Sequence, residues 1–534
     1  MKRNEMTLCL LMVLCLSIFA LTRLPSPARA QVTEIEFLNH WTEPSEVYYW
    51  ANVTKEYNEH HAPSGYQIKM TTVEFDILYD TIMTRHIAQN DPDIISIHAM
   101  WIPTFANWKT AILAVPPADV QANVKANWTQ VTVAGSTYKG IVWGFPTEFN
   151  SWGLVYNKAV LQAGGYSAPP TTWAELESMA VDLTEKDGTG KFIKSGFVPF
   201  VEGMPEEQRY QFMSLLWSNG GEFVDLNTPK VLFNSTNGLE VMQLYNRFGF
   251  GANPTYDYLN MPDYWWNAWV DESIAMMVLP TWMTYVRDAM GDNFSHLAIA
   301  PVPVGPHGTG SKSATYNWML GVTQKAQDAG KANAAWDFLT WINKERPQYD
   351  VPLPGAVSIG AVPKGNGATI MGDYLIRDSI VPSRLCDQAN GRLTVVIGGV
   401  GQAGALIIDD FWFKGFMDLG APAYGRSDQG FLKIKEVQYE IGQMFEKVTL
   451  TGADPVITMT DTATKVQAML PMPGDINIDG VVDIYDAVNL IKDIDAIPGS
   501  VNWNRGRSDI TNDNRVSGAD VTVLVRNYGK TGGY

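Results

Sequence analysis

The chain is poor in cysteine and histidine. Its 534 residues include 3 Cys and 7 His, and Cys386 is the one cysteine beyond residue 30. If the first 30 residues are removed, no internal disulfide can form, so packing and bound ions must stabilise the mature chain. The adjacent residues His60 and His61 form a poor metal site because they are not one helical turn apart.

Positive charge and catalytic motifs are also scarce. The 39 Lys and Arg residues are outnumbered by 56 Asp and Glu, which gives a net charge of −17. This balance argues against nucleic acid or an anionic membrane surface as a partner. The sequence has no GxSxG, GxxxxGK[ST], HExxH or CxxC motif, so we expect no enzyme of the classes that these motifs mark.

Aromatic residues are plentiful by contrast. The chain has 18 Trp and 22 Tyr, and 46% of its residues are hydrophobic. A chain of 534 residues is too long for one core, so two or more domains are expected. Most aromatic side chains belong in those cores, but some are expected to stack on sugar rings, whose apolar C–H faces pack against aromatic rings.

Residues 1–30 have the pattern of a secretory signal peptide. Lys2 and Arg3 precede an apolar stretch at 8–21, and residues 28–30 form a small-x-small cleavage site. The alternative is a membrane anchor, but the apolar run is short for a membrane span. The mature chain is therefore expected to be extracellular or at the cell surface. Candidate N-glycosylation acceptors are Asn52, Asn127, Asn234 and Asn293.

The first hundred residues of the mature chain alternate between strand and helix patterns. Strands are expected at 35–38, 67–73 and 94–97, and helices at 47–58 and 76–89. This alternation predicts a parallel, doubly wound α/β sheet. Ligands of such sheets bind at the carboxyl ends of the strands. Trp41 and Glu43 follow the first strand, and His98 and Trp101 follow the third, so they are candidate ligand-binding residues.

A central stretch at 144–176 carries the most specific pattern. It predicts a strand at 151–156, a short helix at 159–163, and a further helix that Thr172 and Glu175 begin with a capping box. The stretch resembles the core of the extracellular solute-binding proteins, family 1, the carbohydrate-capturing components of ABC importers. The matching residues are Pro146, Tyr156, Asn157, Lys158, Gly164, Pro170, Thr172, Trp173, Ala174 and Glu175. Weaker matches extend the resemblance over about 31–345, and less specific ones to 470.

This resemblance implies a two-lobed α/β, periplasmic-binding-protein-like (type II) fold with a hinge, over residues 31–470. It implies a sugar or oligosaccharide ligand, captured by hinge closure and delivered to a separate ABC permease in the membrane. We expect stacking faces from Trp41, Trp101, Trp217, Trp282 and Trp318, and hydroxyl-binding groups from Glu43, Glu148, Asn150 and Asn317. The alternative for each is an ordinary role, as a core aromatic residue or a solvated polar one.

Residues 471–474 are predicted to be a linker, and two acidic loops follow it 34 residues apart. Oxygen donors at alternate positions of a twelve-residue loop converge on one calcium ion. Loop one offers Asp475, Asn477, Asp479, Val481, Asp483 and Asp486. Loop two offers Asp509, Thr511, Asp513, Arg515, Ser517 and Asp520. The repeated loop and helix resemble a type I dockerin, which implies a small all-α module of two EF-hand-type loops at 475–534, with structural Ca2+.

The resemblance to a dockerin raises two open questions. In dockerins, loop positions 10 and 11 contact a cohesin, and here they are Ile484-Tyr485 and Gly518-Ala519. These pairs differ, so a cohesin-like partner and a calcium-stabilised module without a partner are equally expected. Dockerins also accompany glycoside hydrolases, and Glu43 with Glu148 could mimic a catalytic carboxylate pair. A surface scaffold or adhesion protein is the third alternative. We expect a binding protein without catalytic activity.

Overall fold

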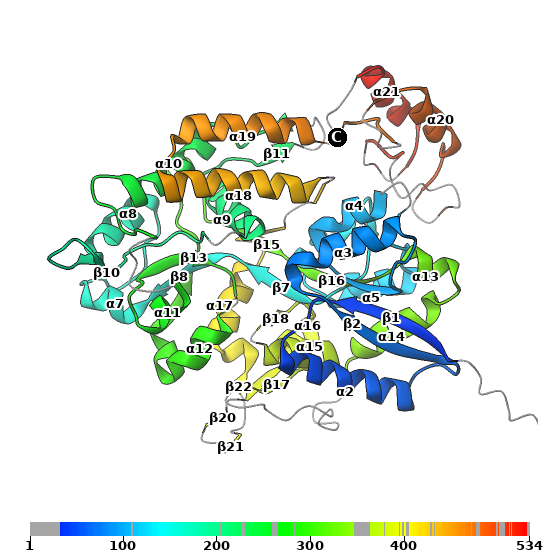
Figure 1. Ribbon diagram of the computed structural model, residues 1–534, viewed down its shortest axis with the longest axis horizontal. Helices are drawn as coiled ribbons and strands as arrows, with labels where there is room; N and C mark the ends of the chain where they lie inside the picture. The colour runs from blue at the N-terminus through cyan, green and yellow to red at the C-terminus, as the bar shows by residue number, and fades with distance from the viewer. Residues whose placement is uncertain are drawn as a thin grey trace, which may run out of the picture.

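The chain forms two lobes and a small C-terminal module, as the computed structural model shows (Figure 1). The structure describes residues 32–530 except for the following: 108–110, 202–203, 226–229, 259–264, 282, 347–363, 379, 395, 398–399, 402–404, 428–429, 432, 471, 477–480, 498–499, 501–507, 512 and 514. The predicted signal peptide and the candidate residues Trp282, Asn477 and Asp479 therefore lie outside the described residues.

Lobe one is built on a five-stranded sheet of order β2-β1-β3-β16-β6. The strands are β1 (Thr33–Asn39), β2 (Tyr66–Thr72), β3 (Ile94–His98), β6 (Phe145–Pro146) and β16 (Trp318–Val322). As expected, β1 runs parallel to β2 and β3. The sheet also contains β16, which is antiparallel to both β3 and β6. β16 enters this sheet from the other lobe, so its direction is set by that crossing.

Helices cover both faces of this sheet. They are α2 (Pro44–His60), α3 (Phe75–Ile87), α4 (Ile102–Asn107), α5 (Ala118–Asn127), α6 (Gln130–Gly135), α13 (Gln324–Asp328), α14 (Ala332–Ile342) and α15 (Ile370–Arg377), with the 3-10 turn η1 (Ala99–Trp101). Phe37 on β1, Trp50 on α2 and Leu339 on α14 are fully buried in one core. The carboxyl end of β3 lies toward lobe two, because His98 Nε2 is 3.0 Å from Oε1 of Glu206 in lobe two.

Lobe two surrounds the antiparallel sheet β13-β8-β14. Its strands are β8 (Gly153–Asn157), β13 (Met276–Leu279) and β14 (Leu297–Ala300), and its helices are α7 (Lys158–Ala163), α8 (Trp173–Asp182), α9 (Pro205–Ser218), α10 (Thr236–Phe250), α11 (Trp265–Val270), α12 (Thr284–Met290), α17 (Phe411–Leu419), α18 (Ile434–Thr451) and α19 (Pro455–Met469). The predicted capping box is confirmed, since Thr172 and Glu175 cap α8. In α9, every residue from Glu206 to Ser218 is buried, so this helix is a central element rather than a surface one.

Two strands cross between the lobes. β7 (Glu148–Ser151) leads from β6 in lobe one to β8 in lobe two, and β15 (Ser313–Tyr316) leads from lobe two back to β16. They pair antiparallel, with Thr315 opposite Ser151 and Tyr316 opposite Asn150. β18 (Val381–Pro382) and β23 (Gly425–Ser427) flank them in a four-stranded sheet. This paired crossing connects the two lobes, and its first strand lies within the central stretch at 144–176.

Minor strands complete the body of the protein. Hairpins form from β4 (Thr137–Tyr138) with β5 (Ile141–Val142), β9 (Glu185–Lys186) with β10 (Phe192–Lys194), β11 (Val224–Asp225) with β12 (Lys230–Val231), and β20 (Val396–Ile397) with β21 (Val400–Gly401). A three-stranded sheet joins β17 (Lys364–Asn366), β19 (Arg392–Thr394) and β22 (Ala405–Leu406), near α16 (Leu385–Asn390). Among the described residues, no helix has the length and apolar character needed to span a membrane.

The C-terminal module contains α20 (Ile484–Lys492) and α21 (Gly518–Asn527) and lies beside lobe one in Figure 1. Its two repeats pair with each other through position 8 of each loop. Val482 accepts a backbone hydrogen bond from Gly529, and Val516 exchanges backbone hydrogen bonds with Asp495 and Ala496. Each loop is therefore tied to the chain that follows the other repeat's helix. The predicted linker is not free of contacts, because the Asn527 side chain donates to the carbonyl of Pro473 at 2.9 Å.

Candidate functional site

Side chains from both lobes meet where three elements come together: the last residue of β3, the first residue of β16, and helix α9. We call this group the interlobe cluster, and its members are His98, Trp101, Glu206, Glu207, Tyr210, Tyr316 and Trp318. Each of these side chains is less than a tenth exposed. A ligand can therefore reach them only when the lobes separate.

Aromatic rings form most of the interlobe cluster. The rings of Tyr210 and Tyr316 stack with their centroids 4.7 Å apart. Trp318 meets Trp101 edge to face at 5.3 Å and lies 4.1 Å from the ring of His40, which is half-buried. Offset and edge-on ring pairs of this kind leave flat apolar faces that suit sugar rings once a partner ring moves away. The structure thus brings together the predicted stacking residues Trp101 and Trp318.

Polar groups in the same cluster join the two lobes. His98 Nε2 lies 3.0 Å from Glu206 Oε1, and the Tyr316 hydroxyl donates to Glu207 Oε1 at 3.2 Å. The backbone N–H of Met100 donates to His98 Nδ1, so Nδ1 carries no proton. Burial lowers the pKa of His98 well below its ordinary value. Burial, and then the Glu206 charge, raise the pKa of Glu207 well above its ordinary value. Both pKa shifts favour the neutral forms of His98 and Glu207, which act here as hydrogen-bonding partners.

Three predicted hydroxyl-binding residues lie on or next to the crossing strands. Glu148 on β7 is buried, accepts a hydrogen bond from the Thr147 hydroxyl at 2.9 Å, and has its pKa raised to about 7 by burial. Asn150 accepts a hydrogen bond from Thr281, which follows β13 in lobe two. Asn317 donates to Ser136 Oγ at 2.9 Å. These contacts place the three side chains where the lobes join.

Trp41 and Glu43, the ligand-binding residues predicted after β1, contact other residues of lobe one. Trp41 is 3% exposed and stacks on Trp50 with an interplanar angle of 11° and a centroid distance of 4.6 Å. The ring of Tyr374 lies 5.0 Å from Trp41. Glu43 is exposed and caps α2 in a capping box with Glu46. Their predicted role in ligand binding stays a prediction, as does that of Trp217, a buried residue of α9 whose ring the guanidinium of Arg426 covers at 4.3 Å.

Sequence reasoning missed Glu206, Glu207, Tyr210 and Tyr316. Tyr316 directly precedes the predicted pair Asn317-Trp318, so its position was a usable signal. Nothing local marks Glu206, Glu207 or Tyr210, because a helix that begins with acidic residues is usually a solvated one. Only the packing of α9 between α18 and β15 buries them.

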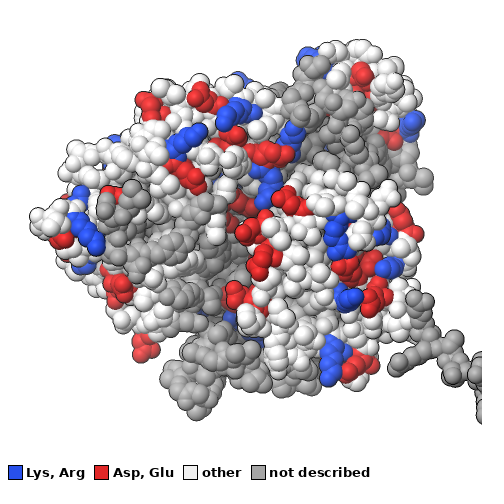
Figure 2. Space-filling view, viewed as in Figure 1, with Lys and Arg blue, Asp and Glu red and all other residues white. Residues whose placement is uncertain are grey.

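Acidic side chains gather along the middle of the molecular face in Figure 2, between the lobes. Three acids on lobe one near the starts of α2 and α3, Glu43, Glu74 and Asp76, are exposed. A rim of negative charge raises the local concentration of cations and disfavours anionic ligands. The acidic side chains therefore argue against an anionic ligand, and the aromatic rings of the interlobe cluster suit a ligand with apolar ring faces.

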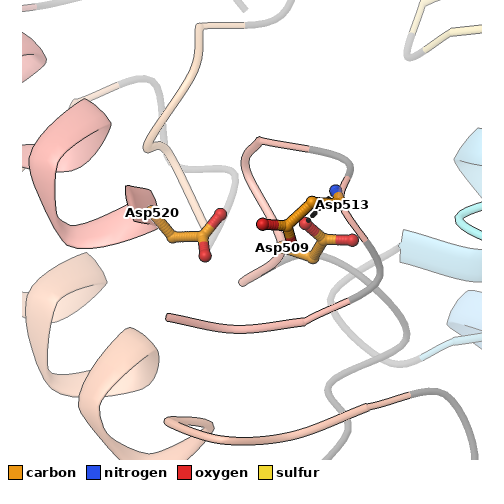
Figure 3. A group of neighbouring side chains, drawn as sticks. All are labelled: Asp509, Asp513 and Asp520. Carbon is orange, nitrogen blue, oxygen red and sulfur yellow. Dashed lines mark hydrogen bonds between the residues drawn. The ribbon is translucent and has the colours of Figure 1, made fainter. Parts of the chain in front are cut away.

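Loop two of the module brings three carboxylates together (Figure 3). One oxygen each from Asp509, Asp513 and Asp520 lies within 4.8 Å of the others. Asp509 and Asp520 are fully buried, and the backbone N–H of Asp513 donates to Asp509 Oδ1 at 3.1 Å. A cation between these three carboxylates would balance their like charges. Hard carboxylate oxygens are the donors that Ca2+ prefers, so this part of the chain fits that ion.

The last acid of each loop also begins the helix that follows. Asp486 forms a capping box with Asp483 at the start of α20, and Asp520 does so with Ser517 at the start of α21. Thr511, at position 3 of loop two, donates its hydroxyl to Asp520 Oδ1 at 2.9 Å. In loop one, Asp486 accepts the backbone N–H of Ile476 at 2.6 Å. The carboxylates that cap these helices are thus the ones that a bound cation would share.

The sequence matches the family described as bacterial extracellular solute-binding protein over residues 41–349, more than half of the chain. The chain belongs to this family. The solute-binding protein is also similar to dockerin type I domains over residues 473–527.

Several solved structures share the two-lobed fold. An ABC transporter solute-binding protein from Thermotoga lettingae, bound with alpha-D-tagatose, is 19% identical, with 82% of this chain and 100% of that chain covered and a TM-score of 0.60. The GacH receptor of Streptomyces glaucescens, solved unliganded and with acarbose, is 18% identical, with 82% and 98% covered and a TM-score of 0.61. The sugar-binding protein MalE from Xanthomonas citri is 16% identical, with 82% and 97% covered and a TM-score of 0.60. At these identities the likeness shows the fold.

Proposed function

We propose that the solute-binding protein captures a neutral sugar or oligosaccharide between its lobes and delivers it unaltered to an ABC permease. The observation that carries this proposal is the interlobe cluster, in which stacked aromatic rings and hydrogen-bonding groups from both lobes meet beside a paired hinge. Similar solved proteins bind alpha-D-tagatose and acarbose. Family membership supports a saccharide as the ligand class, and the acidic side chains between the lobes argue against an anionic one.

In the proposed mechanism, the ligand enters while the lobes are apart. Closure brings the α9 residues Glu206, Glu207 and Tyr210 toward the end of β3, as the structure has them. Trp101 and Trp318 supply stacking faces, while Glu148, Asn150 and Asn317 accept or donate hydrogen bonds to sugar hydroxyls. Closure removes water from these contacts, which strengthens them and retains the ligand until the protein meets the permease.

A ligand screen tests the capture step. Thermal shift with mono-, di- and oligosaccharides identifies a ligand, and calorimetry then compares two variants. Trp318→Leu is expected to weaken binding at least about 10-fold, as expected for the loss of one stacking ring. Trp336→Leu is the matched control, because Trp336 is equally buried but lies in the other core of lobe one. Equal effects of the two variants would contradict the proposed location of the site.

The rival functions predict different results from the same protein. A dockerin-bearing glycoside hydrolase would release reducing sugar from a glycoside on the panel, and Glu148→Gln would abolish that release. A surface scaffold or adhesion protein would show no saturable binding of any small saccharide. Saturable binding with no turnover supports the transport function and opposes both rivals.

We also propose that both loops of the module bind Ca2+ and that the module docks on a cohesin-like surface protein. The observation behind docking is an apolar stripe on α20, whose residues Ile484, Tyr485, Val488 and Ile491 are 42–67% exposed. Exposed apolar patches of this kind mark protein-binding surfaces. Size-exclusion chromatography of the full chain with a cohesin domain, in calcium and in chelator, tests the proposal. The variant Tyr485→Ala is expected to weaken the complex, and a full chain that never binds the domain would favour the module without a partner.

A further inference from the structure

One lysine of lobe one reaches into the second calcium loop. Lys139 lies at the tip of the hairpin formed by β4 and β5, where Lys139 and Gly140 both have positive φ, 50° and 73°. Two consecutive residues with positive φ make the tight two-residue turn that suits the twist of a hairpin. The indole N–H of Trp143 braces this hairpin by donating to the carbonyl of Tyr138 at 3.0 Å. The direction of the Lys139 side chain is thus set by a short, supported turn.

The Lys139 ammonium contacts loop two directly. Its Nζ donates to the backbone carbonyl of Asp509 at 2.5 Å, and Asp509 is the first residue of the loop. The Lys139 side chain is half-buried, and this burial lowers the pKa of its ammonium, while the negative charges of Asp509 and Asp520 act in the opposite direction. These are the two fully buried members of the carboxylate group in Figure 3. The ammonium therefore stands beside the place where the loop needs positive charge.

The basic residue of the loop itself is engaged elsewhere. Arg515 pairs with Asp495 at 2.7 Å, and both side chains are exposed. Its backbone N–H donates to Asp513 Oδ1, but its guanidinium is directed to the outer side of the module. Within the described part of the chain, Lys139 is a cation that lobe one contributes beside the loop-two carboxylates.

We infer that Lys139 lowers the calcium affinity of loop two, and that calcium binding there loosens the module from lobe one. This inference rests on the proposed calcium binding by the module. A divalent cation held by these carboxylates and a half-buried ammonium on the backbone carbonyl of Asp509 repel each other. By linkage, the factor by which docking of Lys139 weakens calcium binding equals the factor by which calcium weakens docking. Lys139 is therefore a positioning residue that couples the ion content of the module to its contact with the sugar-binding body.

Calorimetric titration of the mature full chain with calcium tests this inference. Lys139→Gln is expected to tighten binding at one of two sites by about 5-fold or more, the low end of ordinary coupling between sites. Lys139→Arg keeps the charge and is expected to bind calcium as the wild type does. Lys55→Gln removes the same charge from an exposed position on α2 and is the matched control. Circular dichroism verifies that each variant is folded.

A double-mutant comparison assigns the effect to loop two. In the Asp520→Asn background, only loop one is intact. Lys139→Gln is then expected to leave the calcium affinity unchanged. Small-angle scattering of the wild type is expected to give a larger radius of gyration with calcium than with chelator, and Lys139→Gln to remove that difference. Unchanged or weaker calcium binding by Lys139→Gln would overturn this inference but not the proposal that the module binds calcium. A wild-type chain that binds no calcium would overturn the calcium proposal and the inference together.

Discussion

The body and the C-terminal module handle buried carboxyl groups in different ways. In the body, Glu148 and Glu207 are buried beside hydroxyl groups, and burial raises the pKa of each. In the module, Asp509, Asp513 and Asp520 converge on one another. The body thus limits its charge by keeping a proton, whereas the module gathers charge that a metal ion must balance. The first region should respond to pH and the second to calcium.

Calcium removal is the largest expected effect, and it should act on the module alone. A ligand at 100 times its dissociation constant stabilises a fold by about 2.7 kcal/mol per site, so two loops together contribute about 5 kcal/mol. Differential scanning calorimetry with and without chelator is expected to lower the transition of residues 472–530 and to leave that of the lobes in place. A single transition that chelator does not move would contradict the contrast between the two regions.

The second effect concerns pH and Glu148. Because the pKa of Glu148 is raised to about 7 from an ordinary value of 4.5, the folded body binds this proton more tightly than the unfolded chain does. The contribution of Glu148 to the free energy of unfolding is fully present below pH 4.5 and is lost as the pH rises through about 7. Glu148→Gln is expected to remove this dependence, which amounts to about 3 kcal/mol.

Urea denaturation of the body at several pH values measures this dependence. Glu43→Gln is the control, because Glu43 is exposed and should leave the pH profile of the wild type unchanged. If Glu148→Gln shows the same decline between pH 4.5 and 7 as the wild type does, the group responsible lies elsewhere.

A smaller effect is expected at the interlobe cluster. Tyr316→Phe removes the hydroxyl that donates to Glu207 and leaves a buried carboxyl without that partner. Loss of such a hydrogen bond costs about 1–2 kcal/mol of unfolding free energy. Chemical denaturation measures it, with Tyr485→Phe as the control because Tyr485 is exposed on the module. A shift in the control as large as that of Tyr316→Phe would show that hydroxyl loss alone, and not the buried contact, is being measured.

The smallest expected effect lies on the apolar stripe of α20. Ile491 is 67% exposed, so Ile491→Ser should change the stability of the calcium-loaded module by no more than about 0.5 kcal/mol. Leu490 next to it is 1% exposed, and Leu490→Ala should cost about 2–5 kcal/mol. Thermal unfolding of the two variants in calcium distinguishes a core position from a surface one. Similar losses for both would mean that the stripe is packed in solution.

Local patterns were predictable from the sequence. The capping box at Thr172 and Glu175 depends on residues three apart, and the short helix expected at 159–163 depends on local composition, so both agree with the structure. The two loop-helix repeats agree for the same reason, since their ligand spacing is fixed within twelve residues. Local rules of this kind need no knowledge of the rest of the chain.

Contacts that depend on the joining of distant segments could not be predicted in this way. The antiparallel direction of β16 follows from its entry out of lobe two, which no local pattern records. A tryptophan at a strand end can face ligand or core, and Trp41 stacks on Trp50 while Trp318 joins the interlobe cluster. Likewise, Lys139 lies 370 residues from its partner in loop two. Propensity and spacing carry no information across such separations.

The pairing of β7 with β15 restricts how the two halves of the body can move. Because the backbones of the two crossings are hydrogen-bonded in register, one cannot bend without carrying the other along. We expect rotation of the lobes about an axis across both connecting strands to be the easiest motion. Sliding or twisting one strand against the other would break the backbone hydrogen bonds between β7 and β15. We therefore expect opening of the lobes to bend both connecting strands together.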